Sequence, residues 1–342
     1  MGGHVYVCPD CHEPEYRYHS CQNRHCPKCM NDRTEKWLEK QKALLLPTHY
    51  HLVTFTLPEE FRPVARSNQK IMYRTLFRAS AESLKKIAAD ERYVGGMIGM
   101  TGVLHTWRRD LLYHPHVHYI VPGGGYDKMK NQWHPAGLKF LVPVTALSMI
   151  FRAKFRDELK KTGLFDKIPG QAWKKSWVVH SKAVGDGEHA FEYIAPYVYR
   201  VAISNNRIMK FENGMVTFRY KDSKSKRWKY RTLPALEFIR RYWRHVLPKG
   251  FMKVRSFGFL SSAHRKTLIK IRAQLVALII LLLNPLTEPY EAGAEKETGE
   301  IEETMVCRHC GGKLIKSHKI NRRKRGPPNI LRAQICDGGK RS

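Results

Sequence analysis

The chain has 342 residues, which is enough for a catalytic domain with one or two smaller units. Apolar residues make up 42% of it, an ordinary share for a folded protein that excludes disorder along the whole length. Lys and Arg number 61 against 30 Asp and Glu, a formal net charge of +31. Such an excess predicts a polyanionic partner, with nucleic acid favoured over an anionic membrane surface.

Neither a signal peptide nor a membrane span is evident. Residues 1–4 lack the apolar segment that directs export, so we expect a bacterial protein of the cytoplasm. The apolar run at 275–283 is nine residues long, well short of the ~20 that cross a bilayer. We interpret it as the buried end of a helix.

Residues 1–34 are rich in Cys and His and too short for an apolar core, which predicts a zinc-binding domain that depends on metal for folding. Cys8-Pro9-Asp10-Cys11 and Cys26-Pro27-Lys28-Cys29 are CxxC knuckles separated by fourteen residues, close to a zinc-ribbon spacing. Four thiolates would close one tetrahedral, structural Zn²⁺ site. Further candidate ligands, for a second site or as replacements, are Cys21, His25 and His4.

The middle of the chain alternates between helical and strand patterns. The first predicted elements are helices over 35–46 and 66–90 and strands over 51–57, 99–107 and 116–121. The last two strands form a predicted hairpin around a polar turn at 108–110. The elements predicted next are a helix over 144–161, a strand over 176–184, a helix after 185–187, a strand pair within 201–220 and a helix over 233–246.

Strands mixed with helices and short connections predict an α+β fold with an antiparallel sheet, in preference to a doubly wound parallel one. Beyond this domain we expect an apolar helix over 266–287 and an acidic linker over 288–306. The remaining residues, 307–342, contain Cys307 and Cys310 and a basic run. We interpret them as a flexible tail that touches DNA.

His116 and His118 stand two residues apart in an apolar strand, so their imidazoles project from the same face. Two imidazoles with oxygen ligands suit Mg²⁺ or Mn²⁺ with open positions for a phosphate. The triplet alone is a weak signal, because His49-Tyr50-His51 also fits it. A local cluster with His105 and His114 favours the first pair. His105 would be the third ligand if it faces across the ladder, although a core or surface histidine is at least as common.

Tyr193 and Tyr197 stand four residues apart on a predicted helix and share a face. Such pairs are more often packing residues than nucleophiles. Beside a metal on a basic chain, however, a tyrosine can open a DNA phosphodiester by covalent transfer to the phenol. Pro196 removes a helix hydrogen bond, so the helix either begins close to Ile194 or bends there.

Basic residues after the tyrosines are candidate DNA contacts. Arg200 and Arg207 can pair with phosphate, although solvated charges would need no such role. Residues 221–230 interleave basic side chains with Trp and Tyr. This pattern can follow a phosphate backbone while stacking on unpaired bases, or it can be a solvated hairpin edge.

Taken together, these segments resemble the rolling-circle transposases of bacterial insertion sequences, the ninety-one family, within the HUH endonuclease superfamily. The likeness covers most of residues 1–265 and runs through 20–29, 51–58, 104–107, 114–125, 193–197, 200–207 and 254–258. It implies an N-terminal zinc-binding domain, then a catalytic domain over 35–265 that acts on single-stranded DNA through a 5′-phosphotyrosine intermediate. His116 and His118 would be metal ligands, and Tyr193 and Tyr197 the nucleophiles. The chain begins directly before the first knuckle, where the family has further sequence, so we expect an incomplete set of zinc ligands.

Other functions remain open on sequence alone. A plasmid relaxase or replication initiator shares this chemistry but recognises an origin, and a decayed, zinc-dependent DNA-binding protein would form no covalent adduct. A metal-dependent nuclease that attacks with water would cut DNA without covalent capture. A transposase with an acidic triad would need three converging carboxylates, and no acidic cluster suggests them. The sequence has no GxxxxGK[ST] loop, in agreement with a reaction that needs no nucleotide cofactor.

Overall fold

The computed structural model describes residues 2–21, 23, 25–26, 29–199, 202–222, 225–283 and 306–320. The chain divides into two units, one of residues 24–288 and one of residues 1–23 with 289–342. Most of the expected acidic linker, and Arg200, lie outside the described residues.

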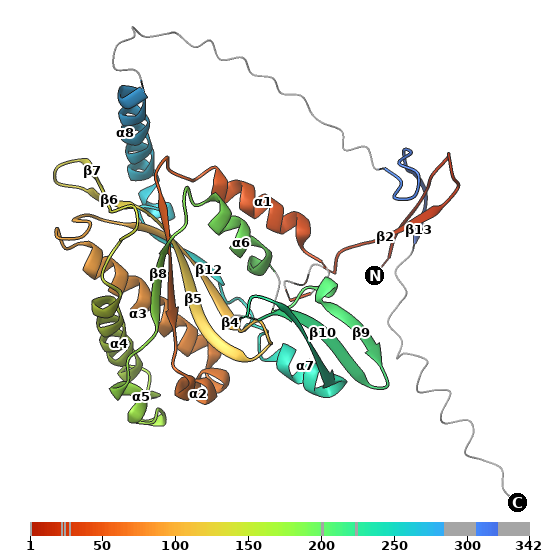
Figure 1. Cartoon of the computed structure of the whole chain (residues 1–342), viewed down its shortest axis with the longest axis horizontal. Coiled ribbons are helices and arrows are strands. Elements are labelled where there is room, and N and C mark those ends of the chain that lie inside the picture. Colours follow the sequence, from red (N-terminus) through yellow and green to blue (C-terminus); the bar gives the residue numbers. More distant parts are fainter. Residues whose placement is uncertain are drawn as a thin grey trace, which may run out of the picture. The chain divides into compact units, whose positions relative to one another are not determined.

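The larger unit is built on a five-stranded antiparallel sheet with the strand order β12-β4-β5-β3-β8 (Figure 1). Its strands are β3 (Tyr50–Thr56), β4 (Gly99–Trp107), β5 (Tyr113–Pro122), β8 (Val179–Ala183) and β12 (Val254–Gly258). The predicted α+β fold with an antiparallel sheet is therefore confirmed. Hairpin β4–β5 closes at residues 108–112, where the polar turn was predicted.

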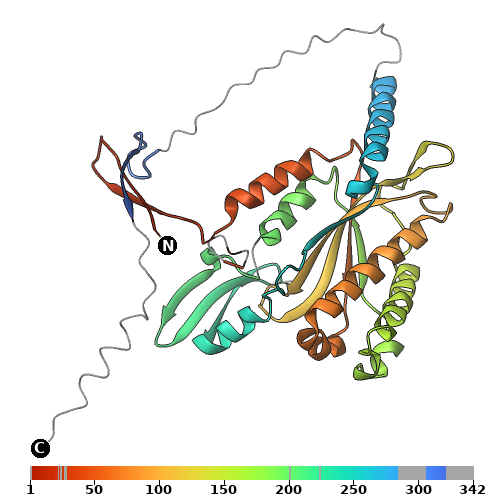
Figure 2. The same ribbon diagram turned by 180° about the vertical axis from the view of Figure 1, so that it is seen from behind.

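One face of this sheet is covered by α2 (Arg62–Ser67), α3 (Gln69–Ala88), α4 (Val144–Lys160) and α5 (Gln171–Lys174). Alternate residues of β5 point into this layer, among them Val117 and Tyr119, which are fully buried. Tyr119 also places its hydroxyl 2.8 Å from Ser80 Oγ on α3. Figure 2 shows α3 and α4 lying side by side beneath the sheet. Because a close-packed aromatic core resists displacement, it fixes the strand that carries the predicted histidines.

The opposite face is covered by α1 (Asn31–Lys42) and α6 (Glu188–Val198). Phe191 and Ile194 of α6 pack with Ile120 of β5 in a second apolar cluster. Two ion pairs, from Lys42 of α1 to Glu188 and Glu192, hold the helices together at 2.6 and 2.8 Å. Pro196 lies inside α6, so the helix does not begin at Ile194 and its first hydrogen-bonded turns precede the proline.

A second antiparallel sheet follows, with the order β11-β10-β9. It consists of β9 (Ile208–Glu212), β10 (Met215–Lys221) and β11 (Trp228–Pro234), and α7 (Ala235–Trp243) packs on one of its faces. Asn213 and Gly214 both have positive φ, as a tight turn between β9 and β10 requires. Strand β11 begins within residues 221–230, for which a solvated hairpin edge was one of the two interpretations.

Helix α8 (Arg265–Leu283) is the predicted apolar helix, but its C-terminal end is not buried. Leu281 and Leu282 are each 72% exposed. Within the described part of the chain, only the first half of α8 packs in an apolar cluster. Its partners there are Phe259 and the hairpin of β6 (Gly124–Asp127) and β7 (Gln132–Pro135). Of the helices among the described residues, none is both long and apolar enough to cross a membrane. The short 3-10 turns are Glu59–Phe61, Phe165–Lys167, Asn205–Arg207 and Ser262–His264.

The smaller unit is a three-stranded sheet with the order β13-β1-β2. Strands β1 (Gly3–Val7) and β2 (Pro14–Tyr18) come from the N-terminal end, and β13 (Ile315–Ile320) comes from the C-terminal end. Because β13 pairs with β1 from Gly3↔Ile320 to Val7↔Ile315, the prediction of a separate flexible tail from residue 307 is wrong over these residues.

Candidate metal and tyrosine site

Strand register brings three imidazoles onto one face of the large sheet. His105 on β4 pairs directly with His116 on β5, and His118 follows two residues later on the same side. The ring centroids lie 4.6 Å (His105 to His118), 4.8 Å (His116 to His118) and 5.4 Å (His105 to His116) apart. One nitrogen from each ring lies within 4.8 Å of the others. The candidate third histidine therefore does face across the ladder.

In two of the three rings, His116 and His118, Nδ1 has a hydrogen-bond partner. His116 donates from Nδ1 to the carbonyl oxygen of His114 at 2.7 Å. Because a carbonyl can only accept, Nε2 of the neutral His116 ring carries the lone pair. Nδ1 of His118 lies 2.8 Å from Thr54 Oγ1 on β3. Metal-binding histidines are commonly oriented in this way by a second hydrogen bond.

The chemistry of this donor set fits a divalent cation. Among the described residues, the buried Nε2 of His105 has no hydrogen-bond partner, which a bound cation would supply. Burial lowers the pKa of His116 to about 4 and holds the pKa of His105 and His118 well below the usual value. All three rings are consequently neutral at pH 7, the form that coordinates a metal.

Helix α6 lies over the same face and carries both tyrosines. The Tyr197 ring is half-buried, 5.3 Å from the His105 ring and 5.8 Å from that of Trp107. The Tyr193 ring lies 6.2 Å from Tyr197 and is 47% exposed. Burial raises the pKa of the Tyr197 phenol, while the nearby guanidinium of Arg207 acts to lower it. Imidazoles and phenols thus lie on one side of the sheet. His51, in the competing triplet, lies among the buried residues of the opposite face.

Arg207 is less free than expected for a phosphate contact. Its Nε donates to the carbonyl of Arg219 at 3.0 Å, and its Nη2 donates to the carbonyl of Arg109 at 2.9 Å. These bonds tie hairpin β4–β5 to the second sheet. Burial also lowers the pKa of Arg207.

Two further side chains beside the Trp107 ring escaped sequence reasoning. Lys253 is buried, lies 4.6 Å above the Trp107 ring and donates from Nζ to the backbone carbonyl of Tyr197. His245, also buried, donates from Nε2 to the carbonyl of Leu111 at 3.2 Å. Both lie in sequence far from the motifs they support, so no local pattern marks them.

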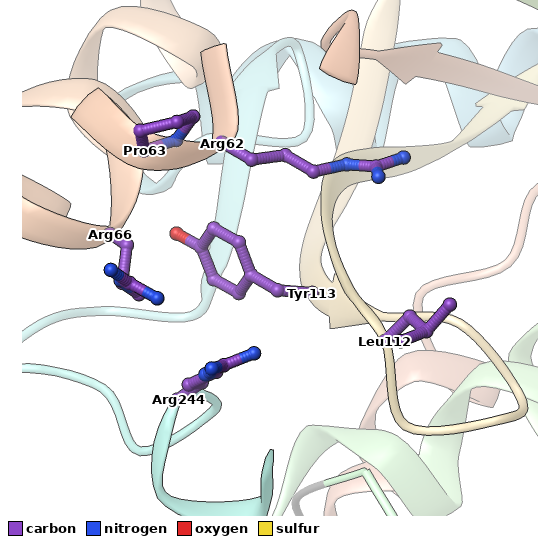
Figure 3. Close-up of a pocket in the computed structure, with 6 residues that line it drawn as sticks. All are labelled: Arg62, Pro63, Arg66, Leu112, Tyr113 and Arg244. Atoms are coloured by element: carbon purple, nitrogen blue, oxygen red, sulfur yellow. The ribbon is translucent and has the colours of Figure 1, made fainter. Parts of the chain in front are cut away.

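An arginine-lined pocket of about 210 Å³ opens beside hairpin β4–β5. Figure 3 shows Arg62, Arg66 and Arg244 around the Tyr113 ring, with Arg66 and Arg244 extending toward the same space. Burial and the charges of neighbouring arginines lower the pKa of Arg244. Nη2 of Arg62 lies 3.4 Å from Nδ1 of His114, two residues before His116. Several positive charges close together favour the binding of an anion such as phosphate.

The cysteines do not form the single four-thiolate site that the N-terminal spacing predicts. Cys8 and Cys11 lie in the smaller unit, where they group with Cys307 and Cys310. The pairing of β13 with β1 brings this second pair of thiols there. The half-buried Cys26 and Cys29 belong to the larger unit.

The other candidate zinc ligands, His25, His4 and Cys21, differ in burial and in hydrogen bonding. His25 accepts a hydrogen bond at Nε2 from the backbone N–H of Leu247 at 3.2 Å, so this nitrogen is already engaged. His4 lies on β1, with its ring 5.0 Å from that of His19. Cys21 is exposed.

Comparison with known proteins agrees with this architecture. Residues 99–267 match the family described as "Putative transposase", and residues 1–57 match the "Transposase zinc-binding domain". "Putative transposase y4qJ" of Sinorhizobium fredii (strain NBRC 101917 / NGR234) is 39% identical over 328 residues, which are 90% of this chain and 81% of the relative. The transposase for insertion sequence element IS801 of Pseudomonas savastanoi pv. phaseolicola is 28% identical over 288 residues, which are 77% of this chain and 67% of that one.

A solved structure, the metal-bound conjugative relaxase TrwC in complex with oriT DNA, is 13% identical with a TM-score of 0.28. It covers 66% of this chain and 70% of the relaxase, and so low a TM-score does not establish a common fold. The sequence matches define a transposase with a zinc-binding domain. The chain belongs to the IS91 family of transposases. Transposases act on DNA, in keeping with the net charge of +31.

Proposed function

We propose that this transposase nicks and joins single-stranded DNA through a 5′-phosphotyrosine intermediate, in transposition of the rolling-circle type. The contact between the Tyr197 and His105 rings, 5.3 Å between centroids, carries the proposal. It brings a phenol beside three imidazoles whose free nitrogens can hold a cation. In this arrangement a phosphate oxygen on the cation would expose its phosphorus to the tyrosine.

His105, His116 and His118 would hold the cation. Its positive charge would neutralise a non-bridging phosphate oxygen. The phenolic oxygen of Tyr197 attacks phosphorus in line, the bond from phosphorus to the 3′ oxygen breaks, and the 3′-hydroxyl leaves with a proton. The tyrosine keeps the 5′-phosphate in a bond of similar energy. Attack by a 3′-hydroxyl reverses the step and joins strands, with no nucleotide cofactor consumed.

Two nearby arginines partly offset the cost of ionising the buried Tyr197 phenol during attack. A free phenol has a pKa of ~10, and burial raises that of Tyr197 further. The positive charges of Arg207 and Arg109 oppose this rise. They would stabilise the developing phenolate without acting as a base. Exposed Tyr193 is then the second nucleophile, able to receive another strand end.

The donor set also bears on the choice of metal. Three nitrogen ligands favour Mn²⁺ over Mg²⁺, because Mg²⁺ prefers oxygen ligands and retains its waters. We therefore expect Mn²⁺ to support nicking at lower concentration than Mg²⁺. A titration of nicking rate against each cation measures this directly.

The outer face of the second sheet supports single-stranded DNA as the substrate. Trp228 and Tyr230 are 54% and 64% exposed on β11, and they pair with Lys221 and Arg219 of β10 on the same face. The Arg219 guanidinium lies 5.1 Å from the Trp228 ring. Exposed rings beside cations stack on unpaired bases while the cations follow the phosphates.

The covalent step is tested with labelled single-stranded DNA that carries an element end. After incubation with Mn²⁺ and denaturing electrophoresis, the wild type should form a labelled protein adduct. Y193F/Y197F should form none, and Y197F alone should abolish the first cleavage while Y193F retains it. Y199F is the matched control, since Tyr199 directly follows the last residue of α6 and packs in the apolar cluster of that helix. Adducts that persist in the double variant would remove the tyrosines from the mechanism.

The substrate is tested by fluorescence anisotropy with single-stranded and duplex oligonucleotides. Stacking contributes ~1–3 kcal/mol per base, so W228A/Y230A should weaken single-strand binding by about 30-fold or more. W243A removes a ring that is 70% exposed on α7 and should have little effect. Equal losses for both strand forms would contradict single-strand recognition on this face.

A further inference from the structure

Two CxxC knuckles from opposite ends of the chain meet in the smaller unit. Cys8 and Cys11 follow β1, and Cys307 and Cys310 precede β13. We propose that these four thiolates bind one structural Zn²⁺, so that the zinc-binding domain of this transposase is assembled from both chain ends. The family match for that domain, residues 1–57, includes only the first pair.

The sulfur positions have the geometry of a metal site. Cys8 Sγ lies 3.4 Å from Cys310 Sγ, and Cys11 Sγ lies 3.7 Å from Cys307 Sγ. All four sulfurs are within 4.8 Å of one another. Sulfurs placed tetrahedrally at ~2.3 Å from zinc are ~3.8 Å apart, whereas a disulfide needs ~2.05 Å. The spacing therefore fits four thiolates around one ion and excludes disulfides in this arrangement.

The two knuckles have the same backbone conformation although their sequences differ. In the first, His12 N–H donates to the Cys8 carbonyl at 2.9 Å, and in the second, Gly311 N–H donates to the Cys307 carbonyl at 2.9 Å. His12 and Gly311, each directly after the second cysteine, both have positive φ, 57° and 80°. Equivalent turns facing one another present two pairs of sulfurs to a common point, as zinc ribbons require.

The knuckles also approach closely at a glycine. A Cβ on Gly312 would lie 1.9 Å from Asp10 Oδ2 and 3.2 Å from Cys8 Sγ. A larger residue at position 312 would displace the Asp10 side chain and crowd the Cys8 sulfur. The pairing of β13 with β1 then continues this contact along the sheet.

The described part of this unit has little else to hold it together. Its apolar cluster consists of Cys8, Cys307 and Leu314, with Tyr6 and Cys11 packed against them. So small a core does not offset the entropy of ordering three strands, and domains of this size commonly depend on a metal. The zinc would supply that stabilisation, and only once residues 307–310 have been synthesised.

The ligand set is tested by zinc content per full-length chain, measured by mass spectrometry of the purified protein. C8S/C11S and C307S/C310S should each lose one zinc equivalent, and the quadruple variant should lose the same single equivalent. C336S, which changes a thiol of neither knuckle, is the control. If C307S/C310S retains every zinc, or if the quadruple variant loses two, the shared site does not exist.

A second measurement separates zinc binding from misfolding of a variant. A site-specific protease sequence is inserted within residues 289–303 of the otherwise unaltered chain, which is then cleaved. With zinc present, the C-terminal fragment should remain bound through gel filtration. A chelator should release it, and the C307S/C310S fragment should be released without chelator. Retention in chelator, or release of the unaltered fragment with zinc present, would overturn the proposal.

Discussion

The imidazole cluster and the four-cysteine cluster are held in place by different means. His105, His116 and His118 lie on adjacent strands of a sheet whose two faces are covered by helices, so register and core packing position them. The four cysteines lie in a unit with a small apolar cluster, on segments joined by one strand pairing. The first cluster is preorganised without a metal, whereas the second depends on the ion that it binds.

This difference matches the chemistry that each cluster can support. Three imidazoles leave coordination positions for a phosphate, so a site that exchanges its ligands must keep its shape when they leave. Four thiolates close a tetrahedral shell and leave no position for substrate. We therefore expect removal of metal to silence the first cluster and to unfold the second.

Chelation should have the largest effect. A structural zinc contributes roughly 10–16 kcal/mol to folding in small zinc domains. Removing it should abolish amide-exchange protection in β1, β2 and β13. All seven tryptophans lie within residues 24–288, so tryptophan fluorescence reports the larger unit alone. Its unfolding midpoint should change little. Amide-exchange protection of β1 that survives chelation would show that the smaller unit does not depend on zinc for folding.

Replacing imidazoles should have the next largest effect, confined to chemistry. H116A/H118A should lower metal-dependent nicking by about 10³-fold or more, because loss of ~4 kcal/mol of charge stabilisation corresponds to that factor. Zinc content should remain that of the wild type. H134A, on hairpin β6–β7, is the control for removing a histidine. Loss of zinc in the double variant would mean that the two clusters are not independent.

The same contrast explains what the sequence could and could not predict. The pairing of His105 with His116 follows from a hairpin with a short turn. The alternation of side chains along β5 and the register of this hairpin were therefore enough to predict the imidazole cluster. The partner of the first knuckle could not be found this way, because Cys11 and Cys307 are 296 positions apart and Cys26 offered a nearer match. Likewise, Leu281 is exposed because hairpin β6–β7 covers only the first half of α8. The spacing of apolar residues along the helix does not predict where that cover ends.

Acidification should weaken the larger unit through its buried histidines, among them His245. Burial lowers the pKa of His245 to about 4, below its ordinary value of ~6.5. Between these values the unfolded chain binds more protons, so the free energy of unfolding falls as pH drops. This residue should account for about 2 kcal/mol between pH 7 and pH 5.

Urea unfolding followed by tryptophan fluorescence measures this loss. H245F cannot bind the proton, so its stability should depend less on pH by about that amount, even though it is less stable at pH 7. Equal pH dependence in both proteins would show that His245 is protonated without unfolding.

The smallest effect is expected from removing the hydrogen bond with which β3 orients His118, a candidate metal ligand. T54V keeps the branched shape of the side chain but removes the acceptor 2.8 Å from His118 Nδ1. Loss of such a second hydrogen bond typically weakens metal affinity by ~10-fold or more, so half-maximal nicking should need correspondingly more Mn²⁺. T56V is the matched control, since Thr56 pairs with His116 on the same face, where His114 already supplies the acceptor. Because β3 itself is fixed by the core, saturating Mn²⁺ should restore the rate of T54V. If T54V and T56V need equal Mn²⁺, packing alone orients His118, and the preorganisation of the imidazole cluster does not extend to its hydrogen bonds.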